Sequence, residues 1–205
     1  MTKTRVVLGV SGASGAVLSL AVARHLTSAD IEIDLVVSPA ARLTLAQECG
    51  PDALKELRQS ASRHHAPADI GASIASGSVP VSGMIVAPCS MRSLGAIAHG
   101  LDDNLLTRAA GVQLKERRPL VLLTREAPLT LAHLRNMTAA AEMGAIILPP
   151  VPAFYLNPVN ITEIADQIAA RAVDCLKVCE PAAKQWHPGN EADPVDRSES
   201  KLHIP

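Results

Sequence analysis

The sequence has few cysteines, and they are not arranged for disulfides or metal binding. Four cysteines occur in 205 residues, without a C-x-x-C pair or another spacing typical of metal ligands. Cys175 and Cys179 lie four residues apart, so we expect both on the apolar face of one helix as buried thiols. These observations argue against a disulfide scaffold and a metal site, and they favour a reducing, cytoplasmic environment.

Long apolar runs and an excess of charge are missing as well. No segment approaches the roughly 20 apolar residues that span a membrane, and residues 1–5 lead into a strand pattern instead of a signal-peptide core. The formal net charge of −1 makes neither nucleic acid nor an anionic membrane an expected partner. With 48% hydrophobic residues, the chain is suited to a single α/β domain with a large core.

Aromatic residues are the scarcest class, with one Phe, one Tyr and one Trp. Phe154 and Tyr155 are adjacent in the proline-rich segment 149–155, which is unsuited to a helix or a central strand. We interpret the pair as a ligand wall or a subunit interface, with an incidental surface pair as the alternative. Trp186 lies in a polar, proline-bearing segment, so we divide the chain into a domain over 1–180 and a tail over 181–205.

Strand and helix patterns alternate along the domain. The sequence predicts strands at 5–10, 31–37, 84–87, 119–124 and 145–148. It predicts helices at 15–27, 39–48, 51–60, 91–99, 102–117, 128–143 and 161–179, and a loop with one helical turn at 61–83. The alternation is typical of βαβ units, so we expect an α/β, Rossmann-like (flavodoxin-like) domain whose parallel sheet has helices on both faces.

The first predicted strand ends in a turn with glycines at three-residue intervals, namely Gly9, Gly12 and Gly15. A glycine turn at a helix N-terminus favours a phosphate, because backbone N–H groups point at it and glycine permits a close approach. The second strand ends at Ser38, where a dinucleotide site normally has an acidic residue. The turn therefore favours a mononucleotide such as FMN over NAD, with a tight connection that binds no ligand as the alternative.

Polar residues follow several predicted strands. In an open parallel sheet these positions meet at one edge, and ligands bind there. The residues at this edge include Gly12, Ala13, Ser14, Ser38, Ser90, Met91, Arg92, Ser93, Arg125, Glu126 and Tyr155. Together they predict a polar site that holds an anion.

Three charged residues are candidates for work on a phosphate. Arg108 and Lys115 are two turns apart on the predicted helix 102–117 and share a face, with a solvated basic stripe as the alternative. Glu126 directly follows Arg125 at a strand end. It either moves a proton to a departing phosphate or forms an ion pair or a helix cap, and the spacing does not decide between these roles.

Seven motifs are distributed along most of the chain. They are G-A-S-G at 12–15, P-C-S-M at 88–91, D-N-L-L-T-R-A-A at 103–110, L-K-E-R-R at 114–118, R-E-A-P at 125–128, H-L-R-N-M at 133–137 and P-A-F-Y at 152–155. In this series the chain resembles the flavin prenyltransferases of UbiX type over residues 5–186. Segment 64–78 is closer to the members described as phenolic-acid decarboxylase subunits. Arg135 and Gln185 depart from the Glu and the Arg that are common in the family.

The resemblance implies a reaction in which reduced FMN is alkylated by dimethylallyl phosphate at ring atom N5 and then at C6. It implies that no metal is needed and that the prenylated flavin passes to a UbiD-type decarboxylase. It also implies a homododecamer with active sites built across subunits. A monophosphate and a diphosphate donor both remain open, as does the aromatic acid that the decarboxylase uses.

The resemblance further implies roles for individual residues. The FMN-binding positions are Gly12, Ala13, Ser14, Ser38, Ser90, Met91, Arg92, Ser93 and Arg125. The positions that hold the prenyl phosphate are Ser14, Arg108, Lys115, Arg125, Tyr155 and Arg171. The catalytic group is Ser14, Glu48, Lys115, Glu126, Tyr155 and Trp186, in which Glu48 and Glu126 transfer protons and Trp186 closes the site with the tail.

Two other functions are alternatives. A flavin-dependent decarboxylase of cysteine type usually relies on a histidine after the first helix and an Asn in a P-A-S-A-N-T-like motif. Here the matching strand end is A-P-C-S-M at 87–91, and His25 lies late in the first predicted helix. A non-catalytic flavin carrier for a decarboxylase would not need Lys115, Glu126 or Tyr155.

Overall fold

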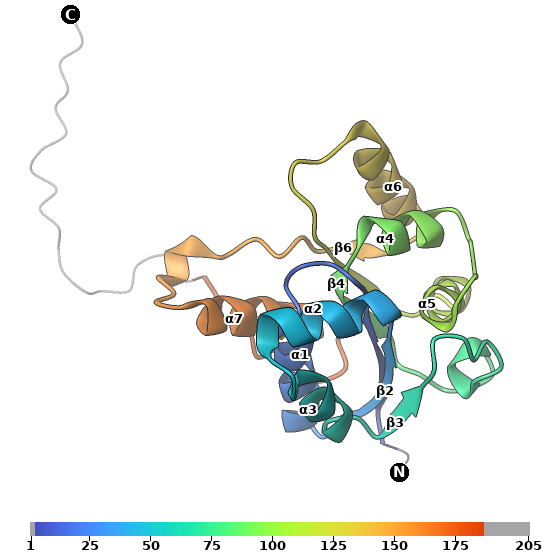
Figure 1. The fold of residues 1–205 in the computed structure, drawn as a ribbon, viewed down its shortest axis with the longest axis horizontal. Helices are drawn as coiled ribbons and strands as arrows, with labels where there is room; N and C mark the ends of the chain where they lie inside the picture. Colours follow the sequence, from blue (N-terminus) through green and yellow to red (C-terminus); the bar gives the residue numbers. More distant parts are fainter. Residues whose placement is uncertain (1–2, 187–205) are drawn as a thin grey trace, which may run out of the picture.

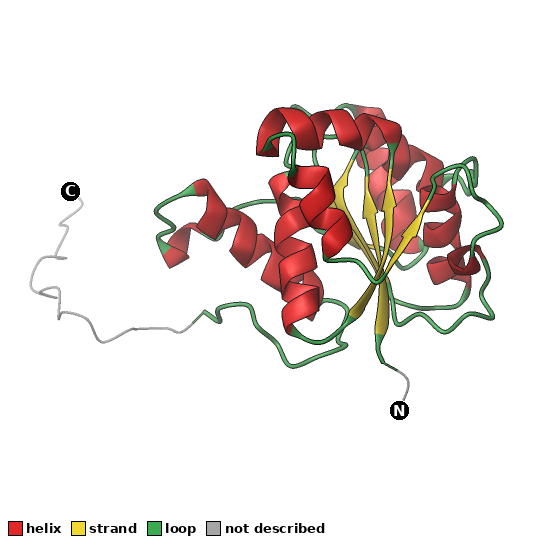
Figure 2. Ribbon diagram, turned by 60° about the horizontal axis from the view of Figure 1, so that its bottom comes forward, coloured by secondary structure: helices red, strands yellow, loops and turns green. Residues whose placement is uncertain are grey.

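The computed structural model describes residues 3–186, and this part of the chain forms one twisted parallel sheet with helices on both faces (Figures 1 and 2). The strands are β1 (Arg5–Val10), β2 (Glu32–Val37), β3 (Arg63–His65), β4 (Met84–Cys89), β5 (Leu120–Thr124) and β6 (Ile146–Ile147). Their order in the sheet is β3-β2-β1-β4-β5-β6, and every neighbouring pair is parallel. The predicted fold class is therefore confirmed.

The helices divide between the two faces of the sheet. They are α1 (Val17–Ser28), α2 (Pro39–Cys49), α3 (Ala53–Gln59), α4 (Met91–Ala98), α5 (Leu105–Lys115), α6 (Leu131–Glu142) and α7 (Ile161–Asp174), with short 3-10 turns η1 (Ser73–Ala75) and η2 (Phe154–Leu156). Buried residues of α1, α2, α3 and α7 pack into one core cluster, and those of η1, α4, α5 and α6 pack into the other. The two ends of Figure 1 accordingly carry α7 and α5.

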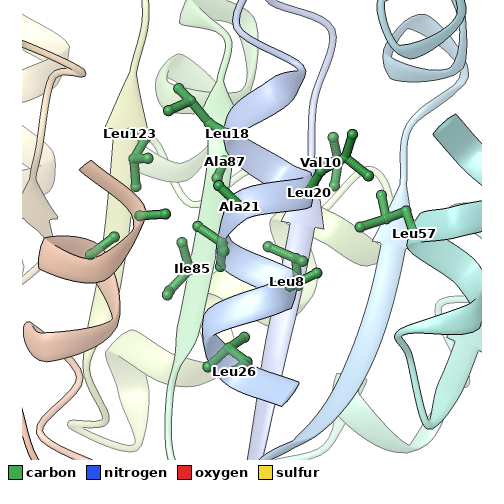
Figure 3. Packing of buried hydrophobic residues seen from close by; sticks show 14 of the residues in the cluster. Leu8, Val10, Leu18, Leu20, Ala21, Leu26, Leu57, Ile85, Ala87 and Leu123 are labelled. Atoms are coloured by element: carbon green, nitrogen blue, oxygen red, sulfur yellow. The ribbon is translucent and has the colours of Figure 1, made fainter. Parts of the chain in front are cut away.

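The core is aliphatic because strands covered on both faces need apolar side chains at nearly every position. Strands β4 and β5 are buried throughout, and Leu8, Ile85 and Leu123 from three neighbouring strands share one core cluster with Ala21 of α1 (Figure 3). Full burial of one such leucine or isoleucine contributes about 1.5–3 kcal/mol. Helix α6 is the exception among the longer helices, since Ala140 is its single buried residue.

Two elements differ most from the sequence-based expectation, while α5 and α6 each begin three residues later than predicted. Strand β3 lies in the segment that was predicted as a loop, because its three residues are Arg63, His64 and His65 and provide no apolar alternation. Helix α7 ends at Asp174, not at residue 179, because the Asp174 carboxylate accepts the N–H groups of Ala182 and Ala183 as the chain turns back. The one helical turn expected within 61–83 is η1.

The end of α7 also corrects the expectation for its cysteines. Cys175 caps the helix and Cys179 lies beyond it, so the two do not share a helical face. Both are half-buried against the core, as is Cys49, and Cys89 is fully buried. Burial raises the pKa of the Cys89 thiol to about 12, which keeps it protonated and unreactive at neutral pH.

The strand order reverses direction between β1 and β4, where the chain leaves one side of the sheet and returns to the other. In doubly wound sheets, ligands bind at this switch point, beyond the carboxyl ends of the strands. The turns after β1 and β4 therefore form the edge at which this fold binds ligands. No helix within residues 3–186 is long and apolar enough to cross a membrane.

Candidate functional site

A cavity of about 550 Å³ opens at the switch point of the sheet. Its walls come from the turns after β1, β2 and β4, from the start of α5 and from the loop before η1. The lining residues are Ser11, Gly12, Ser38, Pro39, Ala40, Pro67, Ala68, Ser90, Arg92, Ser93, Asp103, Asn104 and Leu106. Its volume lies within the range of about 300–1,000 Å³ that is usual for small-molecule sites.

The serines of the cavity are fixed by helix capping. Ser38 is the N-cap of α2, and its Oγ accepts the Ala41 N–H at 3.1 Å. Ser90 is the N-cap of α4, where its Oγ accepts the Ser93 N–H at 3.3 Å and donates to Ser93 Oγ at 3.2 Å. The hydroxyl protons of Ser38 and Ser93 are left to point at a ligand, and the two helix N-termini add a favourable field for an anion.

The turns after β1 and β4 are tied together by Ser11, which is buried. Its hydroxyl donates to the Pro88 carbonyl at 3.0 Å and accepts the Ser90 N–H at 2.7 Å. Gly12 follows, and a Cβ at that position would overlap the Cβ of Ala40 in α2. The first turn thus depends on a small residue because α2 packs directly on it.

The N-terminus of α1 already has an anion of its own. The Glu48 carboxylate, at the end of α2, accepts the N–H groups of Gly15 and Ala16, each at 2.8 Å. Burial alone would raise the pKa of Glu48, but these bonds, the Ser14 hydroxyl and the nearby charge of Arg125 hold it below its ordinary value. A carboxylate of the chain thus occupies these two N–H groups, so a phosphate at the glycine turn would bind other donors of the turn.

Arg125 and Glu126 follow β5 at the same edge. Both are exposed, and the Arg125 N–H donates to the Cys89 carbonyl at 3.0 Å, which ties this loop to β4. Glu126 Oε1 accepts the N–H of Ala127 at 3.1 Å. Within residues 3–186 Glu126 forms no ion pair, so its carboxylate faces solvent beside Arg125.

Tyr155 and Arg171 line a second, smaller cavity of about 190 Å³. It lies between η2 and α7, and Ala183 and Lys184 of the tail complete its wall. Gln167 also lines it, and the Oε1 atom of this side chain is buried without a hydrogen-bond partner among the described residues. The cavity thus has a cation, a phenol and one polar atom that a ligand or water would satisfy.

Trp186 and the tail are described only in part. Trp186 has 61% of its surface exposed and does not line either cavity. Residues 187–205 lie outside the described part of the chain, so the expectation that they cover the site stays a prediction.

The two predicted phosphate cations of α5 lie two turns apart, Arg108 near the beginning of the helix and Lys115 at its last residue. Arg108 is half-buried near the cavity wall, and Nη1 donates to Asp102 Oδ2 at 2.8 Å. Lys115 ends the helix and pairs with Glu116. The seven residue steps from Arg108 to Lys115 span about 10 Å at the helical rise, and the helix runs away from the cavity, so Lys115 lies toward the amino edge of the sheet.

The structure therefore brings part of the predicted site together. Gly12, Ser38, Ser90, Arg92 and Ser93 share one cavity, and Ala13, Ser14, Met91, Glu48 and Arg125 belong to the adjoining turns and helix ends. Arg171 of α7 and Lys115 of α5 lie on opposite faces of the sheet. One chain alone does not place Arg108, Lys115, Tyr155 and Arg171 around a common phosphate.

Several cavity residues were not predicted from the sequence. They are Ser11, Pro39, Ala40, Pro67, Ala68, Asp103, Asn104 and Leu106. Asn104 had a signal, because an Asn before an apolar run is a typical N-cap, and its Oδ1 accepts the N–H groups of Leu106 and Thr107. Pro67 had none; its carbonyl accepts the Leu105 N–H at 2.8 Å and brings the loop to α5.

Arg92 and Asp103 face each other across this cavity wall as an ion pair. Burial would raise the pKa of Asp103, but the hydrogen bond and charge of Arg92, with bonds from Thr107 and Asn104, lower it below its ordinary value. The pair leaves guanidinium N–H groups for a ligand oxygen, because one carboxylate does not use all five.

A third cavity, of about 570 Å³, lies at the opposite, amino edge of the sheet. Its cations are Lys3, Arg5, Arg63 and Arg118. Lys3 pairs with Asp30, Arg5 with Asp34 and Arg63 with Glu32. Both its position and its neutralised charge favour the carboxyl edge as the functional site.

Residues 1–184 match the family model described as Flavoprotein, which places the chain among proteins built around a flavin. It is 49% identical over 185 residues to a probable UbiX-like flavin prenyltransferase of Bacillus subtilis strain 168, with 90% of both chains covered. It is also 49% identical to the flavin prenyltransferase UbiX of Escherichia coli K12, covering 86% of this chain and 94% of that one.

Solved structures agree with the sequence relatives. AnUbiX (PadA1), solved in complex with FMN and dimethylallyl pyrophosphate, superposes with a TM-score of 0.87 at 39% identity, covering 92% of this chain and all of the other. A dodecameric FMN-dependent UbiX-like decarboxylase of Escherichia coli O157:H7 gives 0.85 at 40% identity, covering 90% and 100%. The chain belongs to the UbiX-type flavin prenyltransferases and is a transferase.

The cysteine decarboxylase alternative shares the fold alone. The FMN-dependent cysteine decarboxylase TvaF superposes with a TM-score of 0.60 at 19% identity. In this chain His25 pairs with Asp166 of α7 at 3.0 Å, which turns it toward the helix layer and away from the cavity.

Proposed function

We propose that this chain transfers a dimethylallyl group from dimethylallyl phosphate to atoms N5 and C6 of reduced FMN, for use by a UbiD-type aromatic acid decarboxylase. One observation carries the proposal: the serine-capped cavity lies at the switch point of a sheet that matches the FMN-bound AnUbiX structure along 92% of the chain. When bound, reduced FMN supplies an electron-rich ring that accepts the prenyl group.

The residues of the switch-point cavity fit FMN. The hydroxyls of Ser38 and Ser93 and the guanidinium of Arg92 are donors for a phosphate or a ring oxygen, and Ser90 orients Ser93 by donating to its Oγ. Because Gly12 and Ala13 have small side chains or none, their backbone groups can contact a ligand. Leu106 adds apolar surface to the cavity. We assign Gly12, Ala13, Ser14, Ser38, Ser90, Met91, Arg92, Ser93 and Arg125 to FMN.

The prenyl phosphate site needs groups that one chain keeps apart. We propose that Ser14 and Arg125 of one subunit, together with Arg108, Lys115, Tyr155 and Arg171 from wherever the assembly brings them, hold the leaving phosphate. Charge accumulates on that phosphate as the bond to the prenyl group breaks, and cations aimed at it lower the barrier. The dodecameric relative supports an assembly of this kind, and we propose a homododecamer for this chain.

Two carboxylates have different proposed roles. Glu48 is held ionised by the N-terminus of α1, so it acts as a base or as a fixed negative charge near the allylic cation. Glu126 is free of ion pairs within the described residues and lies beside Arg125, which suits a proton carrier to the departing phosphate. Trp186 and the tail would exclude water, which would otherwise trap the cation.

Reconstitution tests the proposal directly. The purified protein, mixed anaerobically with reduced FMN and dimethylallyl phosphate, should increase the flavin mass by one prenyl group and change its absorption spectrum. Parallel reactions with the diphosphate identify the preferred donor. A chelator should leave the rate unchanged, because we propose no metal; loss of activity restored by Mg²⁺ would contradict that part. A flavin that binds but is never alkylated would identify a carrier.

A single substitution tests the role of Glu126. Glu126→Gln keeps the shape of the side chain and removes its proton chemistry, so single-turnover alkylation should slow by about 10²–10⁴-fold at saturating FMN and donor. A rate within about threefold of the wild type would remove Glu126 from the mechanism and leave Glu48 as the better candidate.

A further inference from the structure

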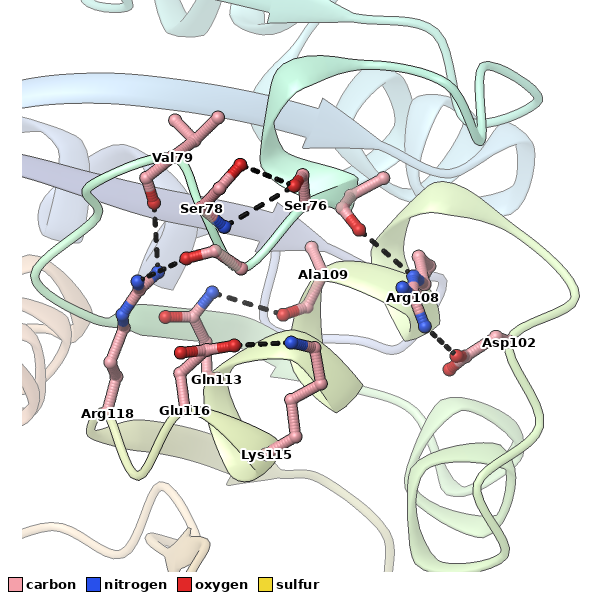
Figure 4. A network of polar contacts seen from close by, with 12 residues as sticks. Ser76, Ser78, Val79, Asp102, Arg108, Ala109, Gln113, Lys115, Glu116 and Arg118 are labelled. Atoms are coloured by element: carbon pink, nitrogen blue, oxygen red, sulfur yellow. Dashed lines mark hydrogen bonds and ion pairs between the residues drawn. The ribbon is translucent and has the colours of Figure 1, made fainter.

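Both α5 cations already have a carboxylate partner in their own chain. Arg108 Nη1 donates to Asp102 Oδ2 at 2.8 Å, and Lys115 Nζ pairs with Glu116 Oε1. Figure 4 shows the Arg108–Asp102 pair near the beginning of α5 and the Lys115–Glu116 pair at its end. A long side chain that is held by a partner loses less conformational freedom when it meets an anion, so these pairs determine where each positive charge lies.

The loop 73–79, which we call the bracing loop, contacts both pairs. Arg108 Nε donates to the Ala75 carbonyl at 3.1 Å. Gly77 lies directly against the other pair: a Cβ there would overlap Glu116 Oε1 and lie 2.5 Å from Lys115 Nζ. The Lys115–Glu116 pair therefore occupies space that exists only because residue 77 has no side chain.

The bracing loop is itself fixed to the helix. Arg118, which follows α5, donates from Nη1 to the Val79 carbonyl at 3.0 Å and from Nη2 to the Gly77 carbonyl at 2.7 Å (Figure 4). Ile74 anchors the start of the loop in the core. An element that positions a side chain must itself be held in place, and this loop is held on both sides of Gly77.

We propose that the bracing loop positions the α5 cations for the prenyl phosphate, with Gly77 and Glu116 as the positioning residues of Lys115. This inference rests on the proposed function, in which Arg108 and Lys115 contact that phosphate in the assembled site. The hydrogen bond and the charge of Lys115 lower the pKa of Glu116, so the pair persists at neutral pH.

Gly77→Ala is a suitable probe because it changes no charge. The backbone of Gly77 has no positive φ, so alanine is compatible with its conformation. The atoms in the way are the ends of two flexible side chains, which move without unfolding the protein. Gly71→Ala is the matched control: it lies in the same connecting segment, also has no positive φ, and its Cβ would meet Asp69 Oδ1 at an ordinary 3.6 Å.

The experiment measures kcat and the KM for dimethylallyl phosphate in the full-length assembled protein. Glu116→Ala and Lys115→Met are included, and salt is kept at about 0.15 M so that remote charges are screened. Gly77→Ala and Glu116→Ala should each raise the donor KM about five- to twentyfold, since misplacing a positioned group weakens its contact. The KM for FMN and the unfolding midpoint should match the wild type, and Gly71→Ala should change nothing.

The outcomes separate this inference from the proposed function. A wild-type donor KM in Gly77→Ala, with Lys115→Met impaired, overturns the positioning role and leaves the proposed function standing. A lower donor KM in Glu116→Ala also overturns it, because the carboxylate would then compete with phosphate for Lys115. Wild-type kinetics in Lys115→Met overturn both the inference and the assignment of Lys115 to the phosphate. Should Gly77→Ala fold poorly, Glu116→Ala carries the test.

Discussion

At the scale of single residues, Glu48 illustrates what a sequence reveals and what it conceals. Its identity as an acidic site residue came from the resemblance to a family, and its position at the end of a helix was predictable. Its partner was not, because a contact between residues 15 and 48 depends on how α2 packs across the first turn. The same holds for Ser11, whose buried hydroxyl joins two turns that are 77 residues apart.

Glu48→Ala should destabilise the protein by about 1 kcal/mol at neutral pH, the usual worth of a side chain that caps a helix N-terminus. Because the folded-state pKa of Glu48 is lowered from its ordinary 4.5, its stabilising effect is complete above that pH and is lost as pH falls through the folded pKa. The difference between wild type and variant should therefore shrink in acid. Urea unfolding at pH 7 and near pH 4 measures it.

The control for this prediction is Glu180→Ala. Glu180 is exposed and lies beyond the last helix, so its loss should change stability by no more than about 0.5 kcal/mol. A Glu48→Ala penalty that grows in acid would contradict the assigned role of the carboxylate.

At the scale of elements, local sequence rules predicted most of the fold. Helices α2, α4, α5 and α7 begin after Ser38, Ser90, Asn104 and Asn160, each of which accepts a backbone N–H as an N-cap should. Strand β3 was not predicted because its three residues are polar and only its pairing with β2 defines it as a strand. The carboxyl end of α7 was predicted five residues too late because Asp174 binds the backbone of a segment eight residues away, and helical periodicity does not reveal such a contact.

Gly12→Ala should disturb the packing of the first turn on α2. The new Cβ overlaps the Ala40 Cβ and lies 3.1 Å from the Ala40 carbonyl carbon. Overpacking of this kind costs about 1–3 kcal/mol, and FMN binding should weaken with it. Ala40→Gly removes the first obstruction, so the double variant should bind FMN more tightly than Gly12→Ala alone.

Fluorescence titration with FMN and denaturant unfolding of all four proteins give the coupling between the two positions. Equal affinities for Gly12→Ala and the double variant would mean that Gly12 acts directly on the ligand and not through α2. Ala40→Gly alone accounts for the cost of a glycine near the start of a helix, which is about 1 kcal/mol.

At the scale of the whole molecule, the predicted site residues are distributed over both faces of the sheet. The resemblance to a family, and not composition or spacing, grouped Arg108, Lys115, Tyr155 and Arg171 as phosphate ligands. Spacing alone placed only Arg108 and Lys115 on one helical face. No local signal tells that a residue acts on a neighbouring copy, since the relation between subunits is not encoded in periodicity. A cavity at the switch point was predictable, whereas the separation of the four proposed phosphate ligands over both faces of the sheet was not.

Mixed oligomers should reveal sites that are shared between subunits. Chains with Ser14→Ala and chains with Lys115→Ala are each expected to be inactive. If Lys115 acts in a neighbour's site, co-refolded hybrids contain some interfaces with both residues intact and should regain part of the activity. Hybrids verified by mass spectrometry that stay inactive would indicate sites formed within one chain.

Helix α6 has a consequence for how this protein moves and assembles. It is twelve residues long and buries Ala140 alone, while Leu131 and Leu134 are exposed to 61% and 47%. A helix of this length is marginal in water by itself, so its Thr130 capping box and its packing on α4 supply most of what opposes its fraying in the isolated subunit. In local-unfolding terms α6 belongs to the low-stability end of the chain. A second copy that covered those leucines would convert this weakly buried helix into one of the slowest-exchanging regions of the protein.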